Sequence, residues 1–324
     1  MRKQQKKVIS IAIKAAVIAL VIWVVYIKLT NNSNLQEFNA LLRKLDTQRL
    51  VNLLVLLLLM MLANWLLECA KWSYLCKPIQ RISFWKAIEA VFCGLSWAIF
   101  TPNRIGEYGG RVLFLSPRKR IHGVLAMAVG AFAQMVITNV IGSLAFAWFA
   151  VHYWKVEGFL GLGCWLLAAS FSVVLIILYF RVALFYEWIR KIKWLASFHR
   201  FFKVLSKYRI AVLNRVFLLS IGRFIIFTMQ YGIAMKTLIP QLPVLPMFLM
   251  VFILFFIQSA LPSLDLVDVG VRSITASYLF GFLTTQEIAV MASAAAIWFV
   301  NLILPAIIGL FFVLKLNIFG HTHH

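Results

Sequence analysis

Long apolar runs dominate this chain and determine its predicted architecture. A helix needs about 20 apolar residues to cross a membrane, because it rises about 1.5 Å per residue and the hydrocarbon core is about 30 Å thick. Six runs reach or approach this length, at residues 8–29, 50–67, 123–151, 159–180, 212–238 and 289–316. They predict an all-α polytopic membrane protein, a single membrane domain over residues 1–324 with six spanning helices.

Polar residues follow directly after one shorter apolar run. As a helix, residues 87–100 would rise only about 21 Å, so they enter the membrane without crossing it. The stretch that follows reads Thr101-Pro102-Asn103-Arg104-Ile105-Gly106-Glu107-Tyr108-Gly109-Gly110-Arg111. Irregular backbone and charged side chains persist at membrane depth only where protein or a water-filled cavity surrounds them. The pattern therefore predicts a re-entrant helical hairpin with a functional site at its tip.

A second interruption repeats this layout after the apolar run at residues 244–257. Its key positions are, in order, Pro262, Asp265, Asp268, Gly270 and Arg272. Residues 245–261 would rise about 25 Å as a helix, so a complete crossing is the alternative, and it would place the C-terminus outside. We favour a second hairpin because proline, acid, glycine and arginine recur together.

The two halves of the chain share one order of elements. Residues 50–151 and 212–316 each run helix, hairpin, helix, and they do so with opposite orientations in the membrane. Interrupted segments at corresponding positions are typical of inverted-repeat transporters with a site near the midplane. Residues 181–209 join the halves and combine basic residues with apolar ones at helical spacing, which predicts an amphipathic helix on the anionic inner leaflet.

Composition and charge support this interpretation. The formal net charge is +22, which in a soluble protein would suggest nucleic acid as a partner. However, 63% of the residues are hydrophobic, the mean hydropathy is +0.92, and basic residues cluster at the ends of apolar runs. There they act as topology signals and contacts to anionic lipid. We expect no nucleic-acid partner, a bacterial-type cytoplasmic (inner) membrane, and both termini in the cytoplasm.

The charged residues within the interruptions are the candidate binding groups. An arginine at the membrane centre costs about 2.5–3.5 kcal/mol on insertion scales, so it needs a partner or water. Arg104 and Glu107 are three residues apart and could pair as a structural pin, but Arg111 adds further positive charge, for which a phosphate supplies bidentate acceptors. The side chains predicted to bind a substrate are Arg104, Glu107, Arg111, Arg223, Asp265, Asp268 and Arg272. Of these, the two aspartates are expected to pair with Arg272 or to take protons.

Prolines and glycines are predicted to shape the hairpin backbones. These positions are Pro102, Gly106, Gly109, Gly110, Pro262 and Gly270. The glycines permit close backbone packing. The cysteines are Cys69, Cys76, Cys93 and Cys164, and they form no C-x-x-C pair. We expect buried thiols rather than disulfides or metal ligands, and no cofactor.

The segment Thr101–Glu107 resembles the motif of a flippase-like family named for the transmembrane region of lysylphosphatidylglycerol synthase. Members of that family typically carry a T-P-G-R-x-G-E motif in the first half and a proline-glycine-arginine motif in the second. Two positions depart from the pattern, because Asn103 stands where the family usually has glycine and Ser273 where many members have glutamate. The resemblance implies lipid translocation and not lysine transfer, since no soluble aminoacyl-transfer domain is recognised.

These features together predict a lipid flippase-like transporter without enzymatic activity. It would move an anionic, phosphate-bearing lipid or lipid-linked substrate between leaflets through a central arginine-lined cavity. Two alternatives remain from the residues alone. One is a membrane-embedded transferase that acts on a polyprenyl-phosphate or phospholipid, for which Glu107, Asp265 and Asp268 supply acidic groups. The other is a small-anion transporter.

Overall fold

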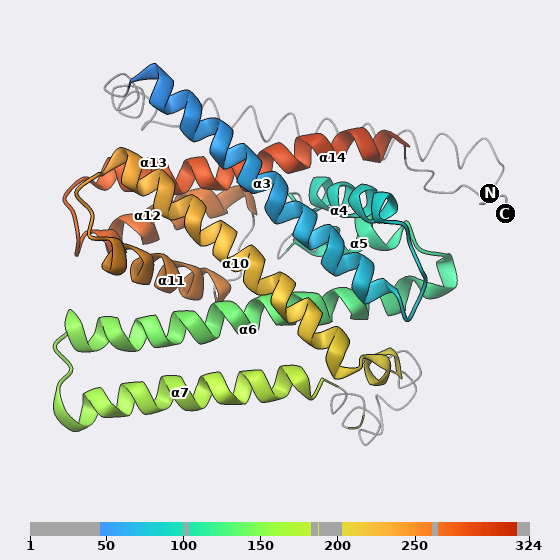
Figure 1. Ribbon diagram of the computed structural model, residues 1–324, viewed down its shortest axis with the longest axis horizontal. Coiled ribbons are helices and arrows are strands. Elements are labelled where there is room, and N and C mark those ends of the chain that lie inside the picture. The colour runs from blue at the N-terminus through green and yellow to red at the C-terminus, as the bar shows by residue number, and fades with distance from the viewer. Residues whose placement is uncertain are drawn as a thin grey trace.

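The computed structural model describes residues 46–99, 101, 104–182, 187, 203–260 and 265–315, and the elements in these ranges are all helical (Figure 1). The helices are α3 (Thr47–Cys76), α4 (Phe84–Ala98), α5 (Ile105–Val112), α6 (Arg120–His152), α7 (Gly158–Phe180), α10 (Ile210–Leu238), α11 (Val244–Ala260), α12 (Asp265–Phe280), α13 (Glu287–Trp298) and α14 (Leu304–Lys315). Short helical turns are η2 (Pro117–Lys119), η4 (Lys203–Lys207) and η5 (Phe299–Ile303).

Five helical segments in the described ranges are long and apolar enough to cross a membrane. They are α3, α6 with η2, α7, α10, and the continuous segment Glu287–Leu314. The protein is therefore an integral membrane protein, and these segments coincide with five of the six predicted spans. The remaining predicted span, residues 8–29, lies outside the described residues, as does most of the predicted amphipathic segment 181–209.

Two pairs of short helices occupy the places of the predicted hairpins. Helix α4 has 15 residues and packs on α5, which has 8; α11 has 17 and packs on α12, which has 16. Figure 1 shows the first pair at the end of the bundle where α3 finishes and α6 begins. The second pair lies at the opposite end, where α10 finishes and α13 begins. Pro102 and Pro262, at the predicted turns, lie outside the described residues.

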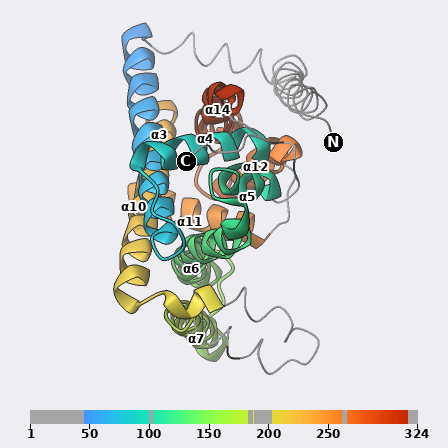
Figure 2. The same ribbon diagram turned by 90° about the vertical axis from the view of Figure 1, so that its right-hand side faces the viewer.

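The two halves of the chain interlock rather than sit apart. Helix α3 packs along α10, and Figure 2 shows them side by side on one flank. Helix α4 packs against α14 and α11 packs against α6, so each pair of short helices contacts the last helix of the other half. Glycines permit both contacts, because a Cβ at Gly309 would overlap the Phe92 carbonyl of α4 and one at Gly142 would overlap Phe256 of α11. The Ser96 hydroxyl also donates to the Ala306 carbonyl at 2.7 Å.

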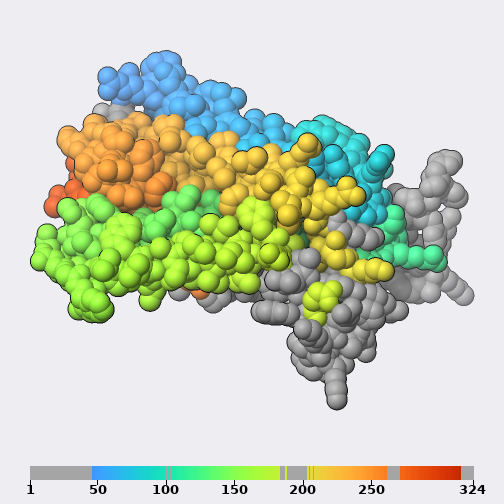
Figure 3. All heavy atoms as spheres, turned by 60° about the horizontal axis from the view of Figure 1, so that its bottom comes forward, coloured from blue at the N-terminus to red at the C-terminus, as the bar shows by residue number. Residues whose placement is uncertain are grey.

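Helix α7 packs on α6 and presents apolar side chains outward. Phe159 is 86% exposed and Leu167 is 72% exposed, and Figure 3 shows this helix on the surface of the molecule. Exposed apolar side chains on a membrane helix face acyl chains, which are as apolar as leucine. We interpret the outer face of α7 as a lipid-contacting surface.

The last predicted span contains an unexpected change of helical period. Residues 289–316 were expected to form one helix, but the π-helical turn η5 lies between α13 and α14. Pro305 explains the change, because it has no N–H to donate to the carbonyl four residues earlier, that of Asn301. The Trp65 indole Nε1–H of α3 donates to this carbonyl at 3.2 Å. A side chain of the first half thus satisfies a backbone group that proline leaves free.

Glycines bring α4 and α5 into backbone contact, as predicted for two of the three positions in α5. A Cβ at Gly110 would lie 2.6 Å from Gly94 Cα, and one at Gly106 would overlap the Trp97 carbonyl. The prediction is wrong for Gly109, which has open space around it because it lies on the other side of α5. Gly94, the partner in α4, was not predicted. Gly270 lies in a part of α12 whose surroundings the structure does not describe.

This contact can be tested with two alanine variants of one helix. Gly110→Ala is expected to lower the free energy of unfolding by about 1–3 kcal/mol, because the added methyl overpacks against Gly94. Gly109→Ala should instead stabilise by about 0.5–1 kcal/mol, since alanine loses less backbone entropy in a helix. Thermal unfolding of the detergent-purified protein measures both, and equal effects would contradict the close approach of α4 and α5.

Candidate functional site

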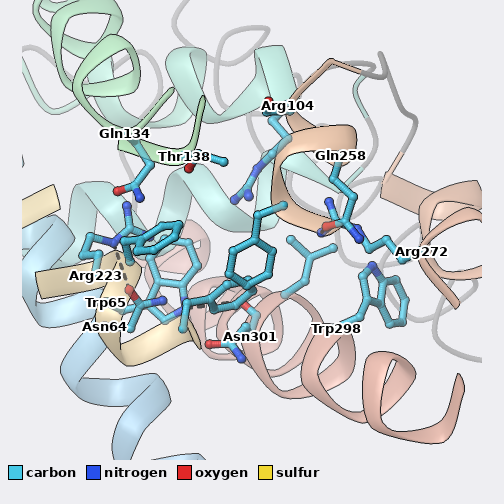
Figure 4. Close-up of a pocket in the computed structure, with 15 residues that line it drawn as sticks. Asn64, Trp65, Arg104, Gln134, Thr138, Arg223, Gln258, Arg272, Trp298 and Asn301 are labelled. Atoms are coloured by element: carbon cyan, nitrogen blue, oxygen red, sulfur yellow. Dashed lines mark hydrogen bonds between the residues drawn. The ribbon is translucent and has the colours of Figure 1, made fainter. Parts of the chain in front are cut away.

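A pocket of about 380 Å³ lies inside the helix bundle, at the meeting point of both halves. Figure 4 shows its polar side chains converging from several helices. Its lining residues are Asn64 and Trp65 of α3, Arg104 before α5, Gln134 and Thr138 of α6, Arg223, Phe224 and Phe227 of α10, Phe255, Gln258 and Ser259 of α11, Arg272 of α12, Trp298 of α13, and Asn301 and Leu302 of η5. The wall thus combines aromatic rings with a few polar groups, as small-molecule sites commonly do.

Three arginines line this pocket, and all three were candidates from the sequence. Arg104 comes from the first short-helix pair, Arg223 from α10 and Arg272 from the second pair. In the view of Figure 4, Arg223 and Arg272 lie on opposite sides, with Arg104 between them. Among the described residues that form the wall there is no aspartate or glutamate. The lining therefore favours an anionic ligand.

Trp65 holds two of these arginines close together. The Arg223 guanidinium carbon lies 5.1 Å from the centre of the indole ring, and that of Arg104 lies 6.0 Å from it. The negative face of an aromatic ring attracts cations at such distances. The ring itself is only 4% exposed and is tied to the Asn301 carbonyl. Trp65 therefore offsets part of the repulsion between two like charges at the pocket wall.

Glu68 of α3 joins three helices behind the pocket. Its Oε1 lies 2.6 Å from Arg111 Nη1 of α5, and its Oε2 lies 2.7 Å from Lys71 Nζ. The same Oε2 accepts a hydrogen bond from Arg223 Nη1 of α10. Glu68 is only 6% exposed, so one buried carboxylate is shared by three cations.

Glu107 extends this cluster to Arg104. Its Oε2 lies 3.1 Å from Arg104 Nε, so the predicted pairing at three-residue spacing is present. Its Oε1 accepts from Arg111 Nη2. Arg111 is therefore 2% exposed between two carboxylates. It was expected to contact the substrate, but the structure places it behind the pocket wall together with Glu107.

The remaining two arginines of the wall are oriented by neutral amides. Arg223 Nε donates to Asn64 Oδ1 at 3.0 Å, and Arg272 Nη1 donates to Gln258 Oε1 at 2.7 Å. Asp265 and Asp268, the predicted acidic partners of Arg272, lie in the part of α12 whose side chains are not described. Their pairing and their protonation remain predictions.

The sequence carried one signal that identifies Glu68. Asn64, Glu68 and Lys71 recur at spacings of four and three residues in an otherwise apolar helix, which places them on one face. The predicted span ended at residue 67 and so left the last two outside the membrane helix. Helix α3 continues to Cys76 and buries both.

The thiols and the metal-ligating residues contribute no further site in the described ranges. Cys69, Cys76 and Cys93 are buried and reduced, and Cys164 is partly exposed. No cluster of three or more His, Cys, Asp or Glu side chains occurs in the described part of the chain.

The family model of the lysylphosphatidylglycerol synthase TM region matches residues 11–309. The chain belongs to this family. The match includes both pairs of short helices and every residue of the pocket wall, so the site lies within the membrane region that defines the family. It also confirms the resemblance seen at residues 101–107. No curated protein and no solved structure matches the chain significantly.

Removing the charge of Glu68 tests its role in the cluster. Glu68→Gln leaves Lys71, Arg111 and Arg223 without their shared anion, so we expect a loss of about 3–5 kcal/mol in stability, the range for breaking one side of a buried ion pair. Glu157→Gln is the matched control, because Glu157 is exposed before α7. Thermal unfolding of the purified variants provides the measurement. A Glu68→Gln protein as stable as the control would show that the cluster is not held by this carboxylate.

Proposed function

We propose that this protein is a lipid flippase-like transporter that moves an anionic, phosphate-bearing lipid between leaflets, with the headgroup passing through the pocket. The observation that carries the proposal is the convergence of Arg104, Arg223 and Arg272 on one pocket inside the bundle. These arginines come from the two short-helix pairs and from a spanning helix. A membrane-embedded site with this charge needs an anion, and a phosphate meets planar guanidinium groups with paired acceptors.

The size of the pocket supports a headgroup as the bound part of the lipid. About 380 Å³ is at the lower end of the range for small-molecule sites. This volume accommodates a phosphorylated headgroup and leaves two acyl chains outside, in the surrounding lipid. The lipid chains therefore need not enter the protein while the headgroup crosses.

The packing of the helices supports an inverted repeat over residues 50–151 and 212–316. Exchanging α3 with α10, the first short-helix pair with the second, and α6 with the segment from α13 to α14 turns the contact between α4 and α14 into that between α11 and α6. Both contacts are present, and α3 packs on α10, its own counterpart. In this proposal the two pairs are re-entrant hairpins that open from opposite faces, and relative movement of the halves alternates access to the site.

The acidic residues of the described ranges favour transport over a membrane-embedded transferase. A transferase needs an acid or base that reaches its substrate. Glu68 and Glu107 are instead paired with cations, and neither lines the pocket. Their observed role is to orient arginines.

Lipid exchange in reconstituted liposomes tests the proposed function. Exchange of fluorescent phosphatidylglycerol should exceed that of phosphatidylcholine, because only the anionic headgroup matches the charge of the pocket. Arg104→Lys and Arg272→Lys keep the charge but lose the planar fork. Each should slow exchange by about tenfold, which corresponds to roughly 1.4 kcal/mol of charge-assisted hydrogen bonding. Quenching of the outer-leaflet fluorophore reports the exchange.

Arg215→Lys is the matched control, because Arg215 contacts the Tyr74 hydroxyl at 3.1 Å and is not part of the pocket wall. Equal exchange of both lipids, or full exchange in the two pocket variants, would reduce the arginines to structural pins. Release of a modified lipid would instead favour the transferase, and uptake of inorganic phosphate without lipid exchange would favour a small-anion transporter.

The proposed topology has an even number of crossings with both termini in the cytoplasm. A C-terminal fluorescent reporter that matures only in the cytoplasm should be active, and a C-terminal alkaline phosphatase should be silent. The reverse pattern at equal expression would contradict the pair of re-entrant hairpins.

A further inference from the structure

Asn301 presents an unused hydrogen-bond acceptor to the pocket. Its Nδ2 donates to the Ile297 carbonyl at 3.1 Å, and a carbonyl can only accept, so the amide oxygen must point the other way. That oxygen is buried and has no hydrogen-bond partner in the described part of the chain. The side chain is 5% exposed and belongs to the pocket wall. A buried acceptor without a partner is destabilising, which indicates that a ligand group completes it.

The backbone around Asn301 keeps this acceptor in place. Asn301 lies in the π-helical turn η5, and π-helical turns are frequent at functional sites. Its own carbonyl accepts the Trp65 indole N–H, and Trp65 in turn lies beneath Arg104 and Arg223. One aromatic ring therefore ties the amide acceptor to the arginines of the same pocket.

The other unused polar atoms of the wall are donors. Gln258 Oε1 accepts from Arg272, which can only donate, so Gln258 Nε2 is the free end, and it has no partner among the described residues. The same holds for the indole N–H of Trp298. These donors and the arginines suit phosphate oxygens, whereas the Asn301 oxygen needs a ligand donor.

The charge of the wall decides what kind of donor this is. An ammonium group would also donate to Asn301, but it would be buried beside three arginines with no carboxylate of the described wall to offset its charge. A hydroxyl group donates without adding positive charge. A neutral donor therefore fits, and a cationic one is opposed.

We propose that the pocket selects a phosphate that carries a nearby hydroxyl, with the arginines binding the phosphate and Asn301 accepting from the hydroxyl. As a lipid, such a ligand has a polyol headgroup. This inference rests on the proposed function for its lipid form, but the same chemistry also occurs in a soluble polyol phosphate. Ammonium-bearing headgroups are excluded by charge.

The decisive comparison uses two lipids of equal charge. Phosphatidylglycerol and phosphatidylpropanol share one phosphodiester charge and a three-carbon headgroup, but only the first carries hydroxyls. We expect wild-type protein in liposomes to exchange labelled phosphatidylglycerol about tenfold faster, since a site built to bind a hydroxyl rejects the analogue without it. Labelled phosphatidylethanolamine should exchange no faster than in protein-free liposomes.

Asn301→Leu assigns this preference to one atom. The variant should reduce the preference for phosphatidylglycerol to about twofold or less, because leucine has no acceptor to leave unsatisfied. Asn52→Leu is the matched control at an exposed position of α3, and it should keep the wild-type preference.

A binding measurement separates this inference from the proposed transport. Glycerol 1-phosphate should raise the thermal unfolding temperature of the purified protein more than propyl phosphate does, because a ligand that binds the native state stabilises it. Equal stabilisation together with equal exchange of the two anionic lipids would overturn the role of Asn301, with lipid transport intact. Absent lipid exchange with a preserved preference for glycerol phosphate would instead overturn the lipid proposal and support a soluble ligand.

Discussion

The buried carboxylate of Glu68 is the interaction on which the candidate site depends. It connects α3 to α5 and α10 by accepting from Lys71, Arg111 and Arg223. Burial of so many charges carries a large desolvation penalty, so the cluster is better explained by specificity of arrangement than by stability. Its effect is to hold one edge of Arg223 while the rest of that guanidinium belongs to the pocket wall. Without this carboxylate, mutual repulsion would separate the arginines that make the pocket attractive to anions.

The pocket is asymmetric although the helices that build it repeat. On one side Arg104 and Arg223 share Trp65 and the carboxylates of Glu68 and Glu107. On the other side Arg272 has the neutral partner Gln258. The first side therefore has part of its charge compensated by protein, whereas the second is oriented without loss of charge. An anion that enters would interact with two cationic surfaces of different strength.

The spanning helices and the two interruptions were predictable because each leaves a local signature. Apolar length identifies a membrane helix, and proline, glycine and arginine between apolar runs identify an irregular segment. This reasoning also found Arg104, Arg223 and Arg272. It misplaced Arg111, because a side chain that is unpaired within its own segment can find a carboxylate 43 residues earlier in the chain. Trp65 and Asn301 could not be found this way, since their roles depend on a π-helical turn and a contact across 236 residues.

The interlocked packing determines which parts can move as units. The α4 and α5 pair shares a backbone contact at Gly94 and Gly110, and α4 is fastened to α14 through Ser96 and Gly309. Helix α11 is joined to α6 in the same manner at Gly142. The rigid bodies of this protein are therefore not its two sequence halves. Each body combines short helices from one half with a long helix from the other, so a displacement that opens one face must draw on both ends of the gene product at once.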